Sequence, residues 1–248
     1  MAHPFELTHE IEVPATPQQA WDAITVGPQI DSWFMGRSQV EPRVGGTNRI
    51  VHPGFTMEST VTVWEPPTRF EFRSQEAEDG SRHAFDYRID QPNSGRTRVR
   101  WIHTGAIAGD DWEAEYEAMG EGDPMYFDKL AKYLTYFQGR HGTPIDAFGP
   151  EIADRERAME LFRTGLGLDG QVLLGDVVRL TPEGFEPVDG VVDYLSPSFL
   201  GVRSDDALYR FLWAFVGSVM IGHHDFSGSV DPAKASAAWQ SWLERTFA

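Results

Sequence analysis

Three stretches of alternating apolar and charged residues place the strongest limit on how this chain folds. In residues 69–73, 85–90 and 98–103, apolar side chains occupy every second position, and mostly charged side chains stand between them. Successive side chains of a strand point to opposite faces, so this alternation predicts strands with one buried face and one face in solvent. Such strands are typical of an antiparallel sheet that is covered on one side.

Turn-forming residues divide the surrounding segment, residues 38–104, into a run of strands. They are Gly45-Gly46, Pro53-Gly54, Pro66-Pro67, Asp79-Gly80 and Asn93-Ser94-Gly95. Another alternating strand is predicted at residues 5–13. Thr16 and Pro17 then indicate the start of a helix, because Thr caps helix N-termini and Pro suits the first turn. A short second helix is predicted at residues 28–34.

A longer helix is predicted at residues 125–138, where the apolar residues are spaced to form one continuous face. The stretch before it, residues 109–123, holds seven acidic residues and no basic one. Three interpretations of this acidic stretch stay open: a solvated loop, a lid over a cavity mouth, or a docking face for a basic partner. As a lid, it would argue against anionic ligands.

The second half of the chain repeats the helix–strands–helix order in a shorter form. Helices are predicted at residues 152–164 and 232–247, and strands at 171–181, 190–203 and 218–226. Residues 206–215 are ambiguous, but the spacing of Leu208, Phe211, Leu212 and Phe215 favours a helix. We therefore expect two domains, residues 1–145 and 150–248. The second is either a degenerate duplicate of the first or an extension without a cavity.

Composition excludes several kinds of partner and site. The net charge is −17 and both halves of the chain are acidic, so neither offers the basic surface that nucleic acids or anionic membranes require. The absence of cysteine excludes disulfides and thiolate chemistry. The first residues do not resemble a signal peptide, and the apolar stretch at residues 208–221 is too interrupted to span a bilayer. A cytoplasmic location is the resulting expectation.

Residues 5–138 resemble the START-like (SRPBCC) superfamily, in the branch similar to the Hsp90-ATPase-activator homology (AHSA1-like) domain. The resemblance depends on the order and spacing of several segments. They are strand 5–13, the segment Pro14-Ala15-Thr16-Pro17 through Ile24, Trp33-Phe34, residues 40–46, residues 61–70, His103-Thr104-Gly105 and helix 125–138. One position differs, because the family often has a Trp near the start of its closing helix, where this chain has Met125 and Tyr126.

The resemblance implies an α+β helix-grip fold, in which a curved antiparallel sheet wraps around a long C-terminal helix and leaves a cavity between them. Members of the superfamily bind lipids, polyketides or other apolar molecules. Some are enzymes such as aromatase/cyclases, and others act on chaperones. Fold alone does not choose among these activities.

The candidate ligand-binding residues lie on the predicted inward face of the sheet and on the helices. They are Trp33, Phe70, Phe72, Phe85, Tyr87, Val99, Trp101, His103, Tyr126, Leu130 and Tyr133. Together they suit an apolar pocket with a few polar groups, for which Tyr87 and His103 are the candidates. The alternative interpretation is that all of them are ordinary core. No Asp or Glu is expected on the same face as His103 to orient it.

No metal site or cofactor site is predicted. His223 and His224 are adjacent on a predicted strand and so point to opposite faces, which leaves only His223 and Asp225 able to share an ion. The sequence also lacks a glycine-rich phosphate loop, a nucleophile elbow and a His-Glu-x-x-His motif.

Three functions are compatible with these features. The leading hypothesis is a protein that binds a small hydrophobic or aromatic ligand. The second is a cyclase- or dehydratase-type enzyme acting on a polyketide-like substrate, with Tyr87 and His103 as weak candidates for its acid and base. The third is an interaction protein or chaperone regulator. Whether the chain is an enzyme stays open at this point.

Overall fold

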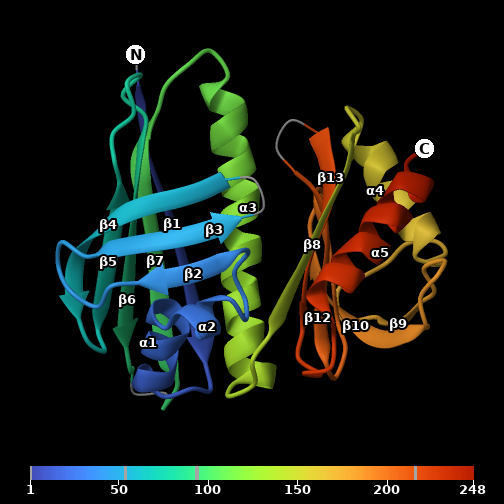
Figure 1. Cartoon of the computed structure of the whole chain (residues 1–248), viewed down its shortest axis with the longest axis horizontal. Coiled ribbons are helices and arrows are strands. Elements are labelled where there is room, and N and C mark those ends of the chain that lie inside the picture. Colours follow the sequence, from blue (N-terminus) through green and yellow to red (C-terminus); the bar gives the residue numbers. More distant parts are fainter. Residues whose placement is uncertain (1, 53–54, 93–94, 215–216) are drawn as a thin grey trace. The chain divides into compact units, whose positions relative to one another are not determined.

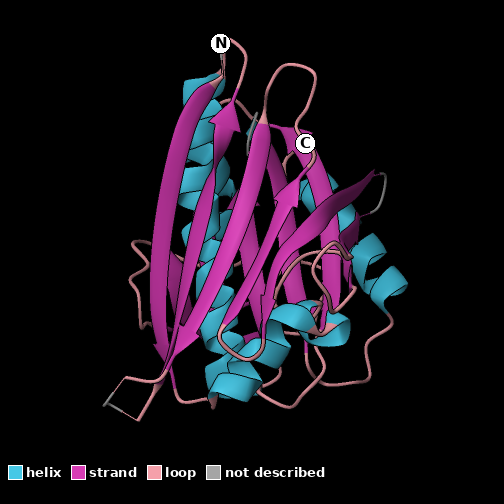
Figure 2. Ribbon diagram, turned by 90° about the vertical axis from the view of Figure 1, so that its left-hand side faces the viewer, coloured by secondary structure: helices cyan, strands magenta, loops and turns pink. Residues whose placement is uncertain are grey.

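The computed structural model of the chain describes residues 2–52, 55–92, 95–214 and 217–248. The chain divides into two compact units, Met1–His141 and Gly142–Ala248 (Figure 1). Each unit holds one antiparallel sheet and its own helices, so the chain is an α+β protein. Coloured by secondary structure, the ribbon shows extended sheets with helices lying against them (Figure 2).

The sheet of the first unit has seven strands in the order β1-β7-β6-β5-β4-β3-β2. The strands are β1 (His3–Val13), β2 (Arg37–Val40), β3 (Thr47–His52), β4 (Phe55–Glu65), β5 (Arg69–Ser74), β6 (Arg82–Asp90) and β7 (Thr97–Ile107). The chain therefore runs back and forth from β2 to β7, and β7 pairs with β1. The turns predicted at Pro53-Gly54 and Asn93-Ser94 lie outside the described residues.

The predicted alternation is confirmed in β5 and β6. Phe70 and Tyr87 point inward and are almost completely buried. On the outer face, Arg69 bonds to Glu71 at 2.8 Å and to Asp86 at 3.0 Å. Both carboxylates are themselves largely covered, so this face is held by an ion-pair network.

Two short helices follow β1, as the sequence predicts. In α1 (Pro17–Thr25) the Thr16 hydroxyl accepts a hydrogen bond from Gln19 N, and the Gln19 side chain accepts one from Thr16 N, which completes a capping box. The second helix, α2 (Gly27–Ile30), is shorter than the predicted 28–34. A Cβ at Gly27 would stand 2.3 Å from the Ser38 carbonyl oxygen, so only glycine fits where the chain passes β2.

The closing helix is much longer than predicted. The helix α3 runs from Trp112 to Lys132 and continues as a π-helical turn at Tyr133–Phe137, so the acidic stretch is helical and the loop interpretation was wrong. Acidic residues in the first turn suit the positive end of the helix dipole. Gly120, Gly122 and Pro124 disfavour a helix locally, but packing of α3 against β1 and β7 overrides them.

The first residue of α3 is a tryptophan, Trp112. Its ring stacks on His3 of β1 at 4.1 Å between ring centroids. This contact packs the acidic N-terminal half of α3 against the edge strand β1.

The second unit has a six-stranded sheet in the order β8-β13-β12-β11-β10-β9. Its elements are β8 (Thr143–Glu151), α4 (Arg155–Gly165), β9 (Val177–Leu180), β10 (Val188–Leu195), β11 (Phe199–Arg203), β12 (Ala207–Trp213), β13 (Ser218–Asp225) and α5 (Pro232–Thr246). As in the first unit, the first strand pairs with the last, a helix follows the first strand and a helix ends the unit.

Three predictions for this half were wrong in detail. The ambiguous segment is the strand β12, because its place between β11 and β13 buries both faces, and a strand buried on both faces has a nearly continuous apolar sequence. Phe215 of that segment lies outside the described side chains. The strand predicted at 190–203 is divided at Ser196-Pro197 into β10 and β11, and the strand predicted at 171–181 is only β9.

Aromatic side chains fill the core of the second unit. Trp242 of α5 lies 6.1 Å from Phe211 and 6.2 Å from Phe162, measured between ring centroids. Trp239 packs edge-on against His223 at 4.7 Å. The space between this sheet and its helices is therefore occupied by indole rings.

Candidate functional site

The first unit contains a cavity of about 460 Å³ against the inward face of its sheet. Its lining comes from α1, α2 and the turn after it, and from strands β2 to β7. The lining residues are Ile24, Ile30, Trp33, Phe34, Ser38, Asn48, Ile50, Met57, Glu58, Ser59, Phe70, Phe72, Ser74, His83, Phe85, Tyr87, Trp101 and His103.

Most of the predicted ligand-binding residues line this cavity. They are Trp33, Phe70, Phe72, Phe85, Tyr87, Trp101 and His103. Their rings form one continuous wall, in which Tyr87 and Trp101 are paired across β6 and β7 with ring planes only 6° apart. A flat apolar molecule can stack against such a wall.

The other four predicted residues are not in the lining. Val99, Leu130 and Tyr133 are fully buried in the packed interior, and Tyr126 packs against Phe34 at 4.8 Å. The reason is that the apolar face of α3 packs onto the sheet directly at β1 and β7. Within the described residues, the cavity is bounded by the sheet and the two short helices, and α3 contributes no side chain to it.

Several short polar residues of the lining, on β2 to β4, were not predicted from the sequence. Ser38, Asn48 and Ser59 face inward there and are too short to fill the space opposite the aromatic wall. Alternation did not reveal them, because their inward positions are polar. His83 was also missed, although it lies two residues before Phe85 on β6 and therefore on the same face.

A chain of three titratable side chains lies at one end of the cavity. His103 Nδ1 is 2.7 Å from Asp123 Oδ2, and His103 Nε2 is 3.1 Å from His83 Nδ1. Only 3% of His103 and 8% of Asp123 is exposed to solvent. The expectation that no acid orients His103 was therefore wrong: Asp123 reaches it from α3, whose length the sequence did not predict.

Burial sets the protonation of the groups around the cavity. Desolvation lowers the pKa of His83 below its ordinary value, the neighbouring His103 lowers it further, and the Asp123 carboxylate opposes both. Desolvation also lowers the pKa of His9 on β1. The pKa of Tyr87 is raised, first by burial and then by the negative charge of Asp123, so its phenol stays protonated.

Two polar atoms of the lining residues are buried without a hydrogen-bond partner among the described residues. They are the indole nitrogen of Trp101 and the hydroxyl oxygen of Ser38. A buried polar group without a partner is costly, and a bound ligand or water can supply one.

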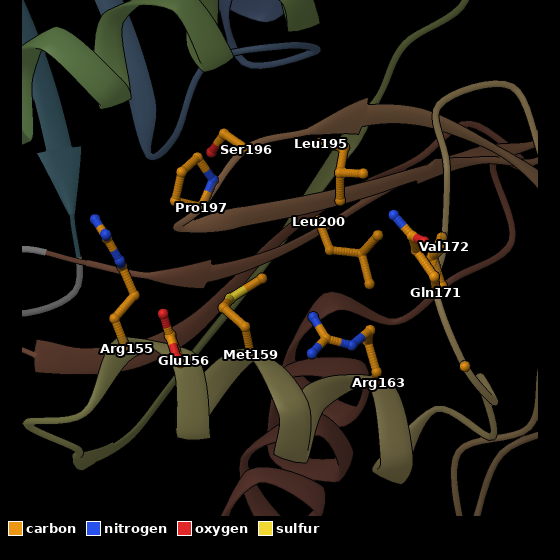
Figure 3. Close-up of a pocket in the computed structure, with 11 residues that line it drawn as sticks. Arg155, Glu156, Met159, Arg163, Gln171, Val172, Leu195, Ser196, Pro197 and Leu200 are labelled. Atoms are coloured by element: carbon orange, nitrogen blue, oxygen red, sulfur yellow. The ribbon is translucent and has the colours of Figure 1, made fainter.

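The second unit has a groove of about 530 Å³ on its surface, between α4 and the turn that joins β10 to β11. Met159 and Arg163 rise from α4 toward Leu200, and Arg155 reaches toward Pro197 (Figure 3). Leu173, Leu174 and Val177, in and beside the loop that follows the groove, are strongly exposed apolar residues. The second unit therefore has a surface groove of its own.

Neither a metal cluster nor a membrane segment is found in the part of the chain that the structure describes. No group of three or more His, Cys, Asp or Glu residues there is placed to hold an ion. None of the helices described there combines the length and the hydropathy that crossing a bilayer requires.

The family model described as "Activator of Hsp90 ATPase homolog 1-like protein" matches residues 14–135. Those residues are an AHSA1-like domain of the SRPBCC superfamily. The AHSA1-like domain includes every residue of the cavity lining and Asp123.

Solved structures similar to the AHSA1-like domain cover about half of this chain. A protein from Mesorhizobium loti is 21% identical, with 52% of this chain and 96% of that chain covered and a TM-score of 0.46. The Aha1 dimer from Colwellia psychrerythraea is 18% identical, with 54% and 99% covered and a TM-score of 0.46. A protein of unknown function from Staphylococcus aureus is 16% identical, with 52% and 92% covered and a TM-score of 0.46. Comparison with curated proteins found no match.

Proposed function

We propose that the AHSA1-like domain binds a small, flat, mostly aromatic molecule in its cavity. The observation that carries this proposal is the cavity itself, about 460 Å³ of space between an aromatic wall and short polar residues. Ligand pockets typically measure about 300–1,000 Å³ and combine apolar walls with a few polar groups.

The polar atoms of the lining indicate what else the ligand carries. The Trp101 indole N–H is a hydrogen-bond donor without an acceptor among the described residues. A carbonyl or ether oxygen on the ligand would accept from it. The chain is acidic overall, with a net charge of −17, so a neutral ligand suits the site better than an anion.

The first test is native mass spectrometry of the freshly purified protein, followed by titration with N-phenyl-1-naphthylamine, a neutral fluorescent aromatic probe. We expect saturable fluorescence enhancement and a higher melting temperature, because a ligand that binds only the folded state stabilises it. A clean apo mass, with no response to this probe or to a panel of neutral aromatics, would refute the proposal.

A second candidate function is an enzyme of the cyclase or dehydratase type acting on a polyketide-like substrate. The observation that favours it is the 2.7 Å contact between His103 and Asp123, since a carboxylate that orients a histidine is a frequent part of acid–base sites. The test is turnover: a His103→Ala variant should bind the aromatic probe and lose activity on the substrate.

A further inference from the structure

The contacts of Asp123, His103 and His83 form a continuous chain from α3, through β7, to β6. Both histidines line the cavity. We propose that this chain is a proton relay, in which His83 Nε2 is the general base for a ligand in the cavity and Asp123 and His103 are positioning residues. This inference rests on the proposed ligand-binding function and adds a reaction to it.

The hydrogen bonds fix which nitrogen of His83 is left for a ligand. An ionised Asp123 can only accept, so His103 Nδ1 carries the proton that is shared with it. His103 Nε2 is then an acceptor, and His83 Nδ1–H donates to it. The lone pair of neutral His83 is left on Nε2, for which no protein donor exists among the described residues.

This arrangement changes the role assigned to His103. Both of its ring nitrogens are engaged by protein groups, so it has no free nitrogen for a ligand. His83, which the sequence analysis did not select, is the member with an open nitrogen. The catalytic base is therefore His83, and His103 transmits the effect of the Asp123 charge.

Packing shields the His103–Asp123 pair from solvent, since only 3% of His103 and 8% of Asp123 is exposed. Phe5 of β1 stands edge-on against the His103 ring at 5.0 Å. It fits there because Gly105 has no side chain: a Cβ at that position would lie 2.9 Å from the Phe5 ring. Exclusion of water strengthens the electrostatic effect of Asp123 on the histidines.

Few other titratable groups face the relay. His9 of β1 interacts electrostatically with Asp123 and His103, but among the described residues no hydrogen bond joins it to either. Tyr87 of β6 remains a protonated phenol, and Glu58 lies in the cavity lining on β4. The lowered pKa of His83 keeps this base neutral near pH 7, as its role requires.

The reaction class is removal of a proton from a carbon next to a carbonyl group. His83 Nε2 takes the α-proton, and the pair of electrons of the broken C–H bond becomes the enolate. The Nδ1 proton of His83 moves to His103 Nε2, which leaves the positive charge on His103 beside Asp123. The Trp101 N–H is available as a donor to the enolate oxygen. The substrate class is thus an enolisable aromatic ketone.

The probe for this step is 2-tetralone, a neutral bicyclic aromatic ketone with exchangeable α-protons. Nuclear magnetic resonance in deuterated buffer measures both its binding and the rate at which its α-protons are replaced by deuterium. We expect the intact chain to accelerate this exchange, with a rate that rises with pH as His83 loses its proton.

His83→Phe keeps a ring in the wall and removes the base. We expect it to bind the probe and to lose about 100-fold in exchange rate, the usual size of a general-base contribution. His83→Gln removes the base with a polar side chain and should show the same loss. The matched control is His9→Phe, which removes the neighbouring imidazole outside the relay and should keep the exchange rate within about twofold of the intact chain.

The role of Asp123 has a readout of its own. Its negative charge favours protonated His83, so Asp123→Asn should move the midpoint of the pH–rate profile to lower pH as well as lowering the rate. Asp123→Glu should restore the midpoint. A carboxylate that served only packing would not shift it.

The outcomes separate this inference from the proposed binding function. If 2-tetralone binds to the intact chain without faster exchange, or if His83→Phe and His83→Gln both exchange at the full rate, the relay is refuted and binding stands. If no neutral aromatic probe binds at all, the proposed function fails and the relay fails with it.

Discussion

The two units of this chain follow the same course, yet one is hollow and the other is filled. Each begins with a strand that pairs with the last strand of its sheet, and each ends with a helix. In the first unit the inward face of the sheet borders a cavity of about 460 Å³. In the second, Trp239 and Trp242 of α5 occupy the inward side among Phe162 and Phe211.

The two units differ in which element carries the large aromatic side chains. In the first unit the large rings belong to β5, β6 and β7, and the positions opposite them on β2 to β4 include Ser38, Asn48 and Ser59. In the second unit the closing helix itself carries two indoles into the core. A common strand order therefore does not fix whether a unit holds a cavity; the sizes of facing side chains do.

The largest expected effect is the loss of a core tryptophan from the second unit. Trp242 is 1% exposed, so Trp242→Ala should lower the free energy of unfolding of the second unit by about 3–5 kcal/mol. Phe72→Ala in the cavity wall should cost less than about 2 kcal/mol, because part of that ring already borders empty space. Native-state hydrogen exchange of the full chain reports each unit separately. Equal losses would contradict the comparison.

The second test places a large side chain in the cavity of the first unit. Ile50 lines the cavity, so Ile50→Trp should weaken binding of N-phenyl-1-naphthylamine at least tenfold, about 1.4 kcal/mol. The matched control is Val51→Trp, the same substitution one residue along β3 on the exposed face, which should leave the affinity unchanged. A similar loss in both variants would mean that the probe binds elsewhere.

The third test uses pH. Burial lowers the pKa of His9, His52 and His83 in the first unit below 6.5, so the unfolded chain binds protons there before the folded unit does. The stability from these neutral histidines is present above pH 6.5 and is lost as pH falls below it toward the folded pKa values. Hydrogen exchange of the first unit at pH 7 and pH 5 measures this loss, which His83→Phe should reduce. An unchanged difference in that variant would exclude a contribution from His83.

The smallest effect concerns a feature that both units share. Thr16 caps α1 and Asp154 caps α4, each through a side-chain oxygen that accepts a backbone N–H. Thr16→Ala and Asp154→Ala should each destabilise their own unit by about 0.5–1 kcal/mol, measured in the same exchange experiment. A much larger loss in one unit would show that its helix has a structural role the other lacks.

Much of the fold follows from local sequence patterns. The alternation of Phe70, Phe72, Phe85 and Tyr87 with charged residues defines β5 and β6, because a strand's two faces depend only on the residues of that strand. The cap at Thr16 locates α1 for the same reason. The aromatic wall of the cavity was accordingly predicted from the sequence.

Local patterns misled where tertiary contacts decide the structure. The spacing of Leu208, Phe211 and Leu212 suits a helix, but a central position in the sheet makes this segment β12. Glycines and Pro124 argue against a helix before residue 125, but packing on β1 and β7 extends α3 back to Trp112.

The sequence by itself thus determined the alternating strands β5 and β6, the capped start of α1 and the aromatic face of the first sheet, since each depends on residues close together in the chain. Only the tertiary structure decided that small residues of β2 to β4 leave that face open, and that Asp123 meets His103. The physical reason is that a cavity and a hydrogen-bonded chain both depend on distances between elements, which the spacing of residues along one strand or helix does not contain.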